Sequence, residues 1–398
     1  MTDKAPGYLL TGGRVVTSDG VLAPGWIQTR GTQIEAVARG DPPGQTSNAT
    51  DVHGQWILPG FVDMHAHGGG GTSFTEGTAQ DAHAAAAFHL AHGTTSIVAS
   101  LVTAPLGELA KRAALLAPLV ADKVLAGLHL EGPFLSPARC GAQHPRHMLR
   151  PDVAALERLH AAAAGHLKVI TIAPELPGAI KLITAAANAG ITAAVGHTDA
   201  TAQVTAAAID AGATHATHLF NGMRPPHHRE PGPAGALLDR DDVSCEVIAD
   251  GVHLHDTIIR LTARIAGPGR LVLVTDAMAA AGMPDGRYRL GSRQVSVTGG
   301  VARLIDEDGR PGAIAGSTAT MAAVVRRAAA AGLSVPDVVA AASTTPARVL
   351  GLADRLGALR PGLAADLVIC DDDLAVRAVM LRGRWLPQRE VSGSAAPE

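Results

Sequence analysis

Histidine, glutamate and aspartate residues follow several apolar runs of this sequence, at the point where each run ends. The run ends that carry them are Asp63-Met64-His65-Ala66-His67, His129-Leu130-Glu131, Gly196-His197-Thr198-Asp199, Thr217-His218-Leu219, Asp250-Gly251-Val252-His253 and Thr275-Asp276. Imidazole nitrogens and carboxylate oxygens are suitable ligands for Zn²⁺, Fe²⁺ and similar ions. A carboxylate beside a metal-bound water can also move protons. The pattern therefore predicts a metal site with an acid–base group.

The spacing of His65 and His67 strengthens this interpretation. Residues two apart on a strand point to the same side, so both imidazoles can face one metal ion while Ala66 points away. Four glycines follow, which is unusual for an ordinary buried strand. Asp276 has two interpretations, because it can be a general acid and base or the N-cap of a helix that starts at Ala277.

The elements that must position these residues alternate between strand-like and helical patterns. Eight strand-like runs are present, at 57–63, 94–99, 124–131, 168–173, 191–196, 215–219, 244–249 and 271–275. Most are continuously apolar, as expected of parallel strands covered on both faces. Eight such units predict an α/β fold of the (β/α)8 TIM-barrel type, in which active sites lie at the carboxyl ends of the strands. An open doubly wound sheet is the alternative, but no G-x-G-x-x-G turn follows the first strand.

Both ends of the chain show short strands separated by turn residues. They predict a small β-sandwich domain built from residues 1–56 and 358–398, with the barrel at 57–357. A segment with strand-like alternation and a Thr298-Gly299-Gly300 turn interrupts the succession of strand-like and helical patterns. This segment predicts a β-hairpin inserted near 286–314.

Composition narrows the class of protein. A net charge of −3 does not indicate binding to nucleic acid or to an anionic membrane, both of which favour a basic protein. No apolar run reaches the roughly 18 residues of a membrane span, and no secretory signal is visible at the start. Three widely spaced cysteines argue against a disulfide framework. We therefore expect a cytoplasmic soluble protein.

Five motifs resemble, in order, those of the N-acetylglucosamine-6-phosphate deacetylases of the amidohydrolase superfamily. They are His-Leu-Glu-Gly-Pro-Phe (129–134), Gly-His-Thr-Asp-Ala (196–200), Thr-His-Leu-Phe-Asn-Gly-Met (217–223), Asp-Gly-Val-His-Leu (250–254) and Val-Thr-Asp-Ala-Met (274–278). The resemblance runs the length of the chain. It implies a metal ion held by Glu131, His197 and His218, with Asp276 as general acid and base.

Members of this family differ in the first-strand motif, and this chain keeps both His65 and His67. The resemblance therefore implies two divalent ions per subunit bridged by Glu131, where many two-metal amidohydrolases use a carbamylated lysine. Zn²⁺ is the first expectation, and Fe²⁺, Co²⁺ and Mn²⁺ are alternatives.

The family also suggests the residues that hold a phosphorylated amino sugar. By motif these are Asn221, Gly222, His253 and the loop from Ile314 to Ser317. Arg229 resembles the phosphate-binding arginine that reaches in from the partner of a homodimer, and a planar guanidinium suits phosphate.

One segment departs from the family pattern. Many members have Gly-Ala-His where this chain has Gly141-Ala142-Gln143, followed by His144. The histidine of those members helps to polarise the acetamide carbonyl. Here Gln143 donates a hydrogen bond instead, His144 takes the place, or two metal ions make the group dispensable. Cys140 lies in the same segment.

Together these features predict a metal-dependent deacetylase of N-acetyl-D-glucosamine 6-phosphate. Deacetylation of the galactosamine epimer or hydrolysis of another amide is the alternative within the superfamily. A catalytically silent barrel used for binding or assembly is the non-enzyme alternative.

Overall fold

The computed structural model describes residues 6–43, 49–306 and 308–387. The parts of the predicted small domain at 1–5, 44–48 and 388–398 lie outside the described residues. The chain divides into two compact units, Met1–Gly60 with Leu359–Glu398, and Phe61–Ala358.

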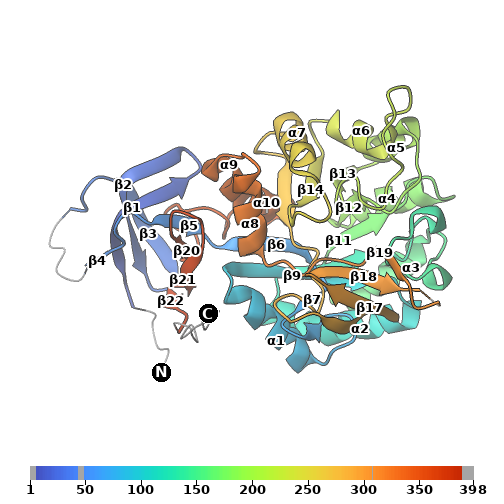
Figure 1. Cartoon of the computed structure of the whole chain (residues 1–398), viewed down its shortest axis with the longest axis horizontal. Helices are drawn as coiled ribbons and strands as arrows, with labels where there is room; N and C mark the ends of the chain where they lie inside the picture. The colour runs from blue at the N-terminus through green and yellow to red at the C-terminus, as the bar shows by residue number, and fades with distance from the viewer. Residues whose placement is uncertain (1–5, 44–48, 307, 388–398) are drawn as a thin grey trace, which may run out of the picture. The chain divides into compact units, whose positions relative to one another are not determined.

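The larger unit contains a parallel eight-stranded sheet among the described residues (Figure 1). Its strands, in the order in which they pair, are β15 (Leu271–Val274), β14 (Ser244–Ile248), β13 (Ala213–Ala216), β12 (Thr192–Val195), β11 (Leu167–Ile172), β10 (Gly127–Glu131), β9 (Thr94–Val102) and β6 (Phe61–Ala66). Chain order and sheet order agree, as a barrel requires. The predicted (β/α)8 fold is confirmed.

A helix follows each barrel strand. The helices are α1 (Ala79–Leu90), α2 (Leu106–Ala121), α3 (Val153–Ala162), α4 (Ala179–Asn188), α5 (Ala202–Asp210), α6 (Gly232–Leu238), α7 (Asp256–Ala266) and α8 (Met321–Ala330). Alanines form much of their buried faces; on α1, Ala82, Ala85 and Ala86 are buried. Small side chains leave room for close packing against the strands, and alanine favours the helix. The remaining elements of this unit are β7 (Gly68–Gly69), β8 (Thr72–Ser73), the 3₁₀ turns η1 (Pro137–Arg139) and η2 (Pro145–His147), α9 (Val335–Val339), the π-helix η3 (Ala340–Thr344) and α10 (Thr345–Val349).

Hydrogen bonds connect the first and last barrel strands. The Thr275 hydroxyl donates to Asp63 at 2.5 Å, and the Asp276 amide donates to the His65 carbonyl at 2.8 Å. Residues from opposite ends of the barrel sequence therefore become neighbours at one rim.

An additional sheet separates β15 from α8. Its antiparallel strands are β16 (Gly286–Leu290), β17 (Arg293–Thr298), β18 (Val301–Ile305) and β19 (Pro311–Ile314). The sequence predicts a hairpin here, but the segment forms four strands. The two outer strands, β16 and β19, are short and mostly exposed, so their alternation is weak in the sequence.

The smaller unit is a sheet domain built from both ends of the chain. Its strands are β1 (Leu9–Thr17), β2 (Gly20–Arg30), β3 (Gln33–Arg39), β4 (Ala49–Asp51), β5 (Trp56–Pro59), β20 (Leu367–Cys370), β21 (Val376–Leu381) and β22 (Arg384–Trp385). They join one continuous sheet that curls over an apolar core, so that Tyr8 meets Trp385 with ring centroids 6.0 Å apart.

The boundary of the first barrel strand differs from its prediction. The sequence predicts one strand at 57–63, but the strand is interrupted at Pro59-Gly60. As a result β5 belongs to the small sheet and β6 to the barrel. Proline cannot donate a backbone hydrogen bond, which makes this a natural strand end.

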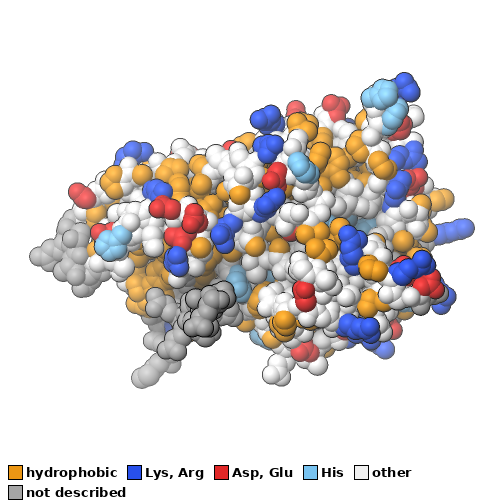
Figure 2. All heavy atoms as spheres, in the orientation of Figure 1, with side chains coloured by type: hydrophobic (Ala, Val, Ile, Leu, Met, Phe, Trp, Pro, Cys, Tyr) orange, Lys and Arg blue, Asp and Glu red, His pale blue; other side chains and the backbone are white. Residues whose placement is uncertain are grey.

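Figure 2 shows acidic side chains lying close to basic ones in several places on the face that it draws. This distribution fits the small net charge. Among the described residues, no helix is both long enough and apolar enough to cross a membrane.

Candidate metal-dependent active site

The candidate ligands lie at the carboxyl ends of five barrel strands. His65 is on β6, His67 follows its last residue, and Glu131 is the last residue of β10. Ala66 lies between the two histidines, and Leu130 directly precedes Glu131. The alternation of a strand directs these two side chains to the opposite face. All three candidate ligands are buried.

His197, His218 and Asp276 occupy equivalent positions on their strands. Each comes two residues after the strand ends, and each has a positive φ, at 46°, 27° and 49°. This left-handed conformation is costly for residues other than glycine and persists where the surrounding structure enforces it, commonly at functional sites. No helix begins at Ala277, which instead bridges to Ala66 and Ser317. The N-cap interpretation of Asp276 is therefore wrong.

These six residues form two groups that can each hold a metal ion, His65 with His67 and Asp276, and Glu131 with His197 and His218. One carboxylate contacts histidines of both groups. Glu131 Oε1 lies 3.0 Å from His197 Nε2 and 2.9 Å from His218 Nε2, whereas Oε2 lies 3.3 Å from His67 Nε2.

The protonation pattern of the imidazoles fits a cation. His65 Nδ1 lies 3.0 Å from Glu246 Oε2, and His67 Nδ1 lies 3.1 Å from the Ser100 carbonyl oxygen. Both partners only accept, so each Nδ1 donates, and each Nε2 offers a lone pair to a cation once it has given up its own proton. The two Nε2 atoms nevertheless lie 3.3 Å apart, and two lone pairs cannot form a hydrogen bond. A positive charge between them satisfies both.

The second group shares this arrangement at His197, whereas His218 Nδ1 has no hydrogen-bond partner among the described residues. His197 Nδ1 lies 2.9 Å from the Arg139 carbonyl oxygen, which leaves its Nε2 facing His218 Nε2 at 3.2 Å. The donor set of two imidazoles and a carboxylate suits Zn²⁺ or Fe²⁺. Both groups therefore fit a divalent ion.

The electrostatics of the site favour positive charge. Burial acts to lower the pKa of His65, but the charges of Glu246 and Asp276 outweigh it and raise the pKa to about 9. Burial likewise opposes the charge on His67, whose hydrogen bonds to Asp276 and Glu131 raise the pKa to about 10. A site that attracts protons this strongly attracts a divalent cation for the same reason, and the two compete.

The carboxylates remain ionised in spite of burial. Desolvation acts to raise the pKa of Glu131, but hydrogen bonds from His197, His218 and His67 hold it well below its usual range. Burial acts in the same way on Asp276, and the neighbouring His65 and His67 lower its pKa. Asp276 therefore stands in the site as an anion that can accept a proton.

Glu246 supports the site from β14, and the sequence reasoning missed it. Its side chain is fully buried. Besides accepting from His65, it accepts from His215 Nε2 at 2.9 Å and from the His218 backbone amide at 2.9 Å. Such partners orient the ligand imidazoles. The available signal was a glutamate inside the apolar run Cys245-Glu246-Val247.

The two groups open into a cavity of about 360 Å³. The residues that line it are His67, Glu131, Gly141, Ala142, Gln143, His197, His218, Asn221, Gly222, His253, Asp276, Leu290, Arg303, Ala313, Ile314 and Gly316. Of the predicted substrate residues, Asn221, Gly222, His253, Gln143 and Ile314 thus surround one space. His253 is held in place by Asp250, whose Oδ2 lies 2.7 Å from His253 Nδ1.

Two predicted substrate residues do not reach this cavity. Arg229 lies on an exposed turn, where its amide contacts His227 Nδ1 at 3.2 Å. His144 accepts from the Arg146 amide and stacks on His147, with ring centroids 4.7 Å apart. Gln143, by contrast, is buried; it donates to Glu131 Oε2 and accepts from the Thr103 amide at 2.8 Å.

Arg303 lines the cavity without having been predicted. Among the described lining residues it is the one lysine or arginine. It comes from β18 of the inserted sheet, where Ala302 and Leu304 on either side are buried. Its guanidinium donates to the Gly312 carbonyl at 3.1 Å and forms no ion pair with a described residue. Most of its donors thus remain available.

Sequence comparison identifies the family to which this site belongs. The family model described as Amidohydrolase family matches residues 56–386, which include every candidate ligand and most of the chain. The chain belongs to the amidohydrolase family.

Relatives of this amidohydrolase match most of its length. It is 35% identical over 380 residues to N-acetylglucosamine-6-phosphate deacetylase of Bacillus subtilis (strain 168), covering 93% of this chain and 94% of the relative. It is 36% identical to N-acetylgalactosamine-6-phosphate deacetylase of Escherichia coli O157:H7, covering 95% of this chain and 98% of that protein.

A solved structure gives the same indication. The chain superimposes with a TM-score of 0.91, at 47% identity, on N-acetyl-D-glucosamine-6-phosphate deacetylase of Mycobacterium smegmatis. The match covers 95% of this chain and 99% of that one. That protein is an aspartate-to-alanine variant in complex with N-acetyl-D-glucosamine-6-phosphate.

Proposed function

We propose that this amidohydrolase removes the acetyl group of N-acetyl-D-glucosamine 6-phosphate, giving D-glucosamine 6-phosphate and acetate. The observation that carries the proposal is two residue groups that could each hold a cation, with the Glu131 carboxylate in contact with histidines of both and ionised Asp276 beside them in one cavity. The names of the full-length relatives support the substrate class. The test is acetate release from this substrate together with metal analysis, and a metal-loaded protein that releases no acetate would overturn it.

Two divalent ions per subunit are proposed, one held by His65, His67 and Glu131 and one by Glu131, His197 and His218, with Asp276 beside His65 and His67 as the proton carrier. Zn²⁺ is the first candidate, with Fe²⁺, Co²⁺ and Mn²⁺ as alternatives. Ions held there would polarise the acetamide carbonyl and lower the pKa of the attacking water.

Asp276 carries the proton in the proposed mechanism. Its Oδ1 faces His67 Nε2 at 3.2 Å, which leaves Oδ2 for proton transfer. Asp276 takes a proton from the water as the water oxygen bonds to the carbonyl carbon. It then gives that proton to the amide nitrogen as the C–N bond breaks, so that the amine leaves in neutral form.

The cavity walls would hold the sugar phosphate. Asn221 lies on the same turn as His218 and donates to its carbonyl at 3.2 Å, so the sugar contact and the metal ligand are fixed together. His253 and Gly222 line the adjoining wall, and Ile314 approaches from the inserted sheet. Such positioning lowers the entropic cost of reaching the transition state.

Removing the guanidinium of Arg303 should weaken substrate binding more than turnover. A charged hydrogen bond to phosphate contributes about 1.5–3 kcal/mol, so Arg303→Gln should raise KM at least roughly tenfold, with a smaller change in kcat. Steady-state kinetics measure both. The matched control is Arg287→Gln, an exposed arginine of the same sheet that does not line the cavity. An unchanged KM would show that Arg303 does not contact the substrate.

Arg229 is proposed to reach the site of the partner subunit in a homodimer. Arg229 is not among the residues that line this chain's own cavity, which motivates a complementation test. Arg229→Gln and Asp276→Asn should each be nearly inactive as pure proteins. Mixed dimers would contain one site with both groups intact, so mixing under subunit exchange should restore activity. If subunit exchange is demonstrated and activity is still not restored, Arg229 does not act in the site of the partner subunit.

Gln143 rather than His144 is expected to affect activity. Gln143→Ala removes a donor that orients Glu131, and losing such a partner of a metal ligand typically costs 10- to 100-fold in affinity or activity. His144→Ala should stay within about twofold, since its side chain lies outside the cavity lining. Rates and metal content of the two variants are compared directly. If His144→Ala lowered the rate more than Gln143→Ala, His144 would be the residue that helps to polarise the acetamide carbonyl.

The galactosamine epimer is the second candidate substrate, because the Escherichia coli relative is named for it and is about as similar. The two substrates differ at one hydroxyl group. Comparing kcat/KM for both in the same acetate-release assay decides between them. A barrel used only for binding would release acetate from neither.

A further inference from the structure

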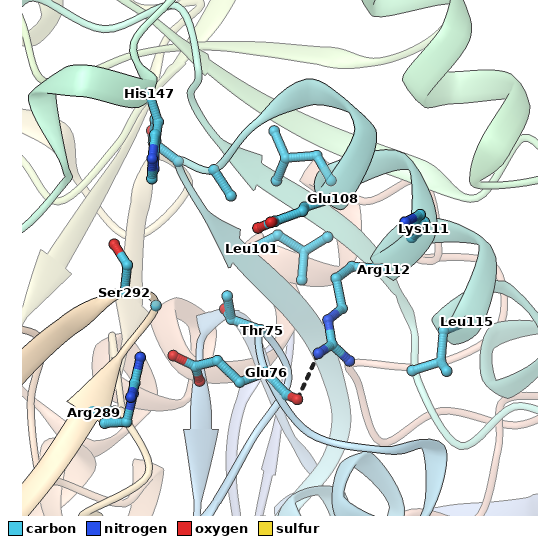
Figure 3. A pocket seen from close by; sticks show the side chains of 14 residues that line it. Thr75, Glu76, Leu101, Glu108, Lys111, Arg112, Leu115, His147, Arg289 and Ser292 are labelled. Atoms are coloured by element: carbon cyan, nitrogen blue, oxygen red, sulfur yellow. Dashed lines mark hydrogen bonds between the residues drawn. The ribbon is translucent and has the colours of Figure 1, made fainter.

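A second cavity adjoins the active site and is about as large, at about 370 Å³ against about 360 Å³. Figure 3 shows α2 on one side of it, the inserted sheet on the other and Thr75 and Glu76 between them. The lining residues used below are Thr75, Glu76, Thr103, Glu108, Lys111 and Arg289. A space of this size accommodates a molecule as large as the substrate.

Three polar atoms of this cavity have no hydrogen-bond partner among the described residues, namely Thr75 Oγ1, Glu76 Oε1 and His147 Nδ1, and each atom is itself buried. Thr75 is only 7% exposed. Buried polar atoms are rarely left unpaired, because the lost hydrogen bonds to water are not replaced. The residues that carry them line one cavity, whose wall therefore contains polar groups with no partner among the described residues.

The cavity carries charges of both signs. Glu76 and Glu108 supply two carboxylates, and Lys111 and Arg289 supply two cations that form no ion pair with a described residue. Arg112 is already engaged by the carbonyls of Glu76 and Gly77. Figure 3 shows Glu76 and Arg289 on the same side of the cavity, with Glu108 and Lys111 on α2. The wall therefore offers partners of both signs to a ligand that carries both charges.

We propose that this cavity is a second binding site for a small phosphorylated amine. The ammonium group contacts Glu76 and Glu108, and the phosphate contacts Arg289 and Lys111. The proposal rests on the proposed function for the identity of the ligand, which is the product of that reaction, D-glucosamine 6-phosphate. The substrate fits poorly, because acetylation removes the positive charge that the carboxylates require.

Thr103 connects the second cavity to the catalytic groups. It lines the cavity, and its amide donates to Gln143 while its hydroxyl donates to the Glu131 carbonyl at 3.0 Å. Both bonded residues lie in the active site. A ligand that shifts Thr103 therefore disturbs Glu131 and Gln143, and product bound here inhibits the enzyme without competing with the substrate.

The binding test is calorimetric titration of the full-length, metal-loaded protein with D-glucosamine 6-phosphate. Two sites per chain are expected. In Glu76→Gln and Arg289→Gln the second site should bind at least about tenfold more weakly, as expected for loss of a charged hydrogen bond. Glucose 6-phosphate, which has no amine, should be similarly weak at that site. Matched controls are Glu157→Gln and Arg158→Gln on α3, exposed charges that line neither cavity.

The kinetic test is the pattern of product inhibition. Inhibition should have a noncompetitive component in the unaltered protein and become purely competitive in Glu76→Gln and Arg289→Gln. One product site per chain, or an unchanged second site in both variants, would overturn the proposal. If the protein releases no acetate yet shows two sites that respond to these substitutions, the proposed function fails and the second site stands.

Discussion

Asp276→Asn is expected to abolish most turnover while leaving the metal content of the protein unchanged. The amide has nearly the shape of the carboxylate and keeps an oxygen that can face His67. It cannot accept the proton of the attacking water, and it cannot return one to the departing amine. General acid–base groups contribute about 100- to 10,000-fold, and kcat should fall within that range.

The measurement combines acetate release with elemental analysis of the same protein sample. Asp152→Asn is the control, because Asp152 caps α3 by accepting from the Ala154 amide, and asparagine caps equally well. That variant should retain a near-normal rate. A near-normal rate in Asp276→Asn would remove Asp276 from the mechanism, and a parallel loss of metal would reassign it as a ligand only.

The sequence predicts the ligands because their positions follow local rules. His65 and His67 are two apart on one strand, and His197, His218 and Asp276 each follow an apolar run that ends abruptly. In a barrel all such ends meet at one rim. The eight runs therefore specify the fold and the candidate ligands together, with no knowledge of the contacts between them.

Arg303 and Glu246 depend on information that is not local. Glu246 lies inside an apolar run, and its function appears only when β14 is placed near β6 and β13. Arg303 reaches the cavity because the inserted segment forms four strands with a particular register, in which Arg303 pairs with Ile314. Neither pairing follows from the residues themselves. The choice between Gln143 and His144 as the residue that enters the site has the same origin. The two side chains are adjacent in sequence, and only the path of the loop determines which of them points into the cavity.

Glu131→Gln should remove both metal ions, whereas removal of a histidine from one group should remove one. Glu131 contacts histidines of both groups, with Oε1 directed to His197 and His218 and Oε2 to His67. The amide replaces one acceptor oxygen by a donor and removes the negative charge. Either orientation of the amide then places N–H groups against one of the two sets of imidazoles.

Elemental analysis after dialysis against a single metal distinguishes shared from separate sites. We expect two ions per chain in the unaltered protein, one in His67→Ala, one in His197→Ala and none in Glu131→Gln, with acetate release lost in the last. Loss of a buried charge partner also destabilises a protein by about 3–5 kcal/mol, so thermal unfolding must be measured in parallel. The two histidine variants keep the test informative if Glu131→Gln does not fold, because a variant that loses both ions on removal of one imidazole would contradict two independent groups. One ion retained in folded Glu131→Gln would show that the carboxylate belongs to a single group, and the chain would then hold its two ions without a common ligand.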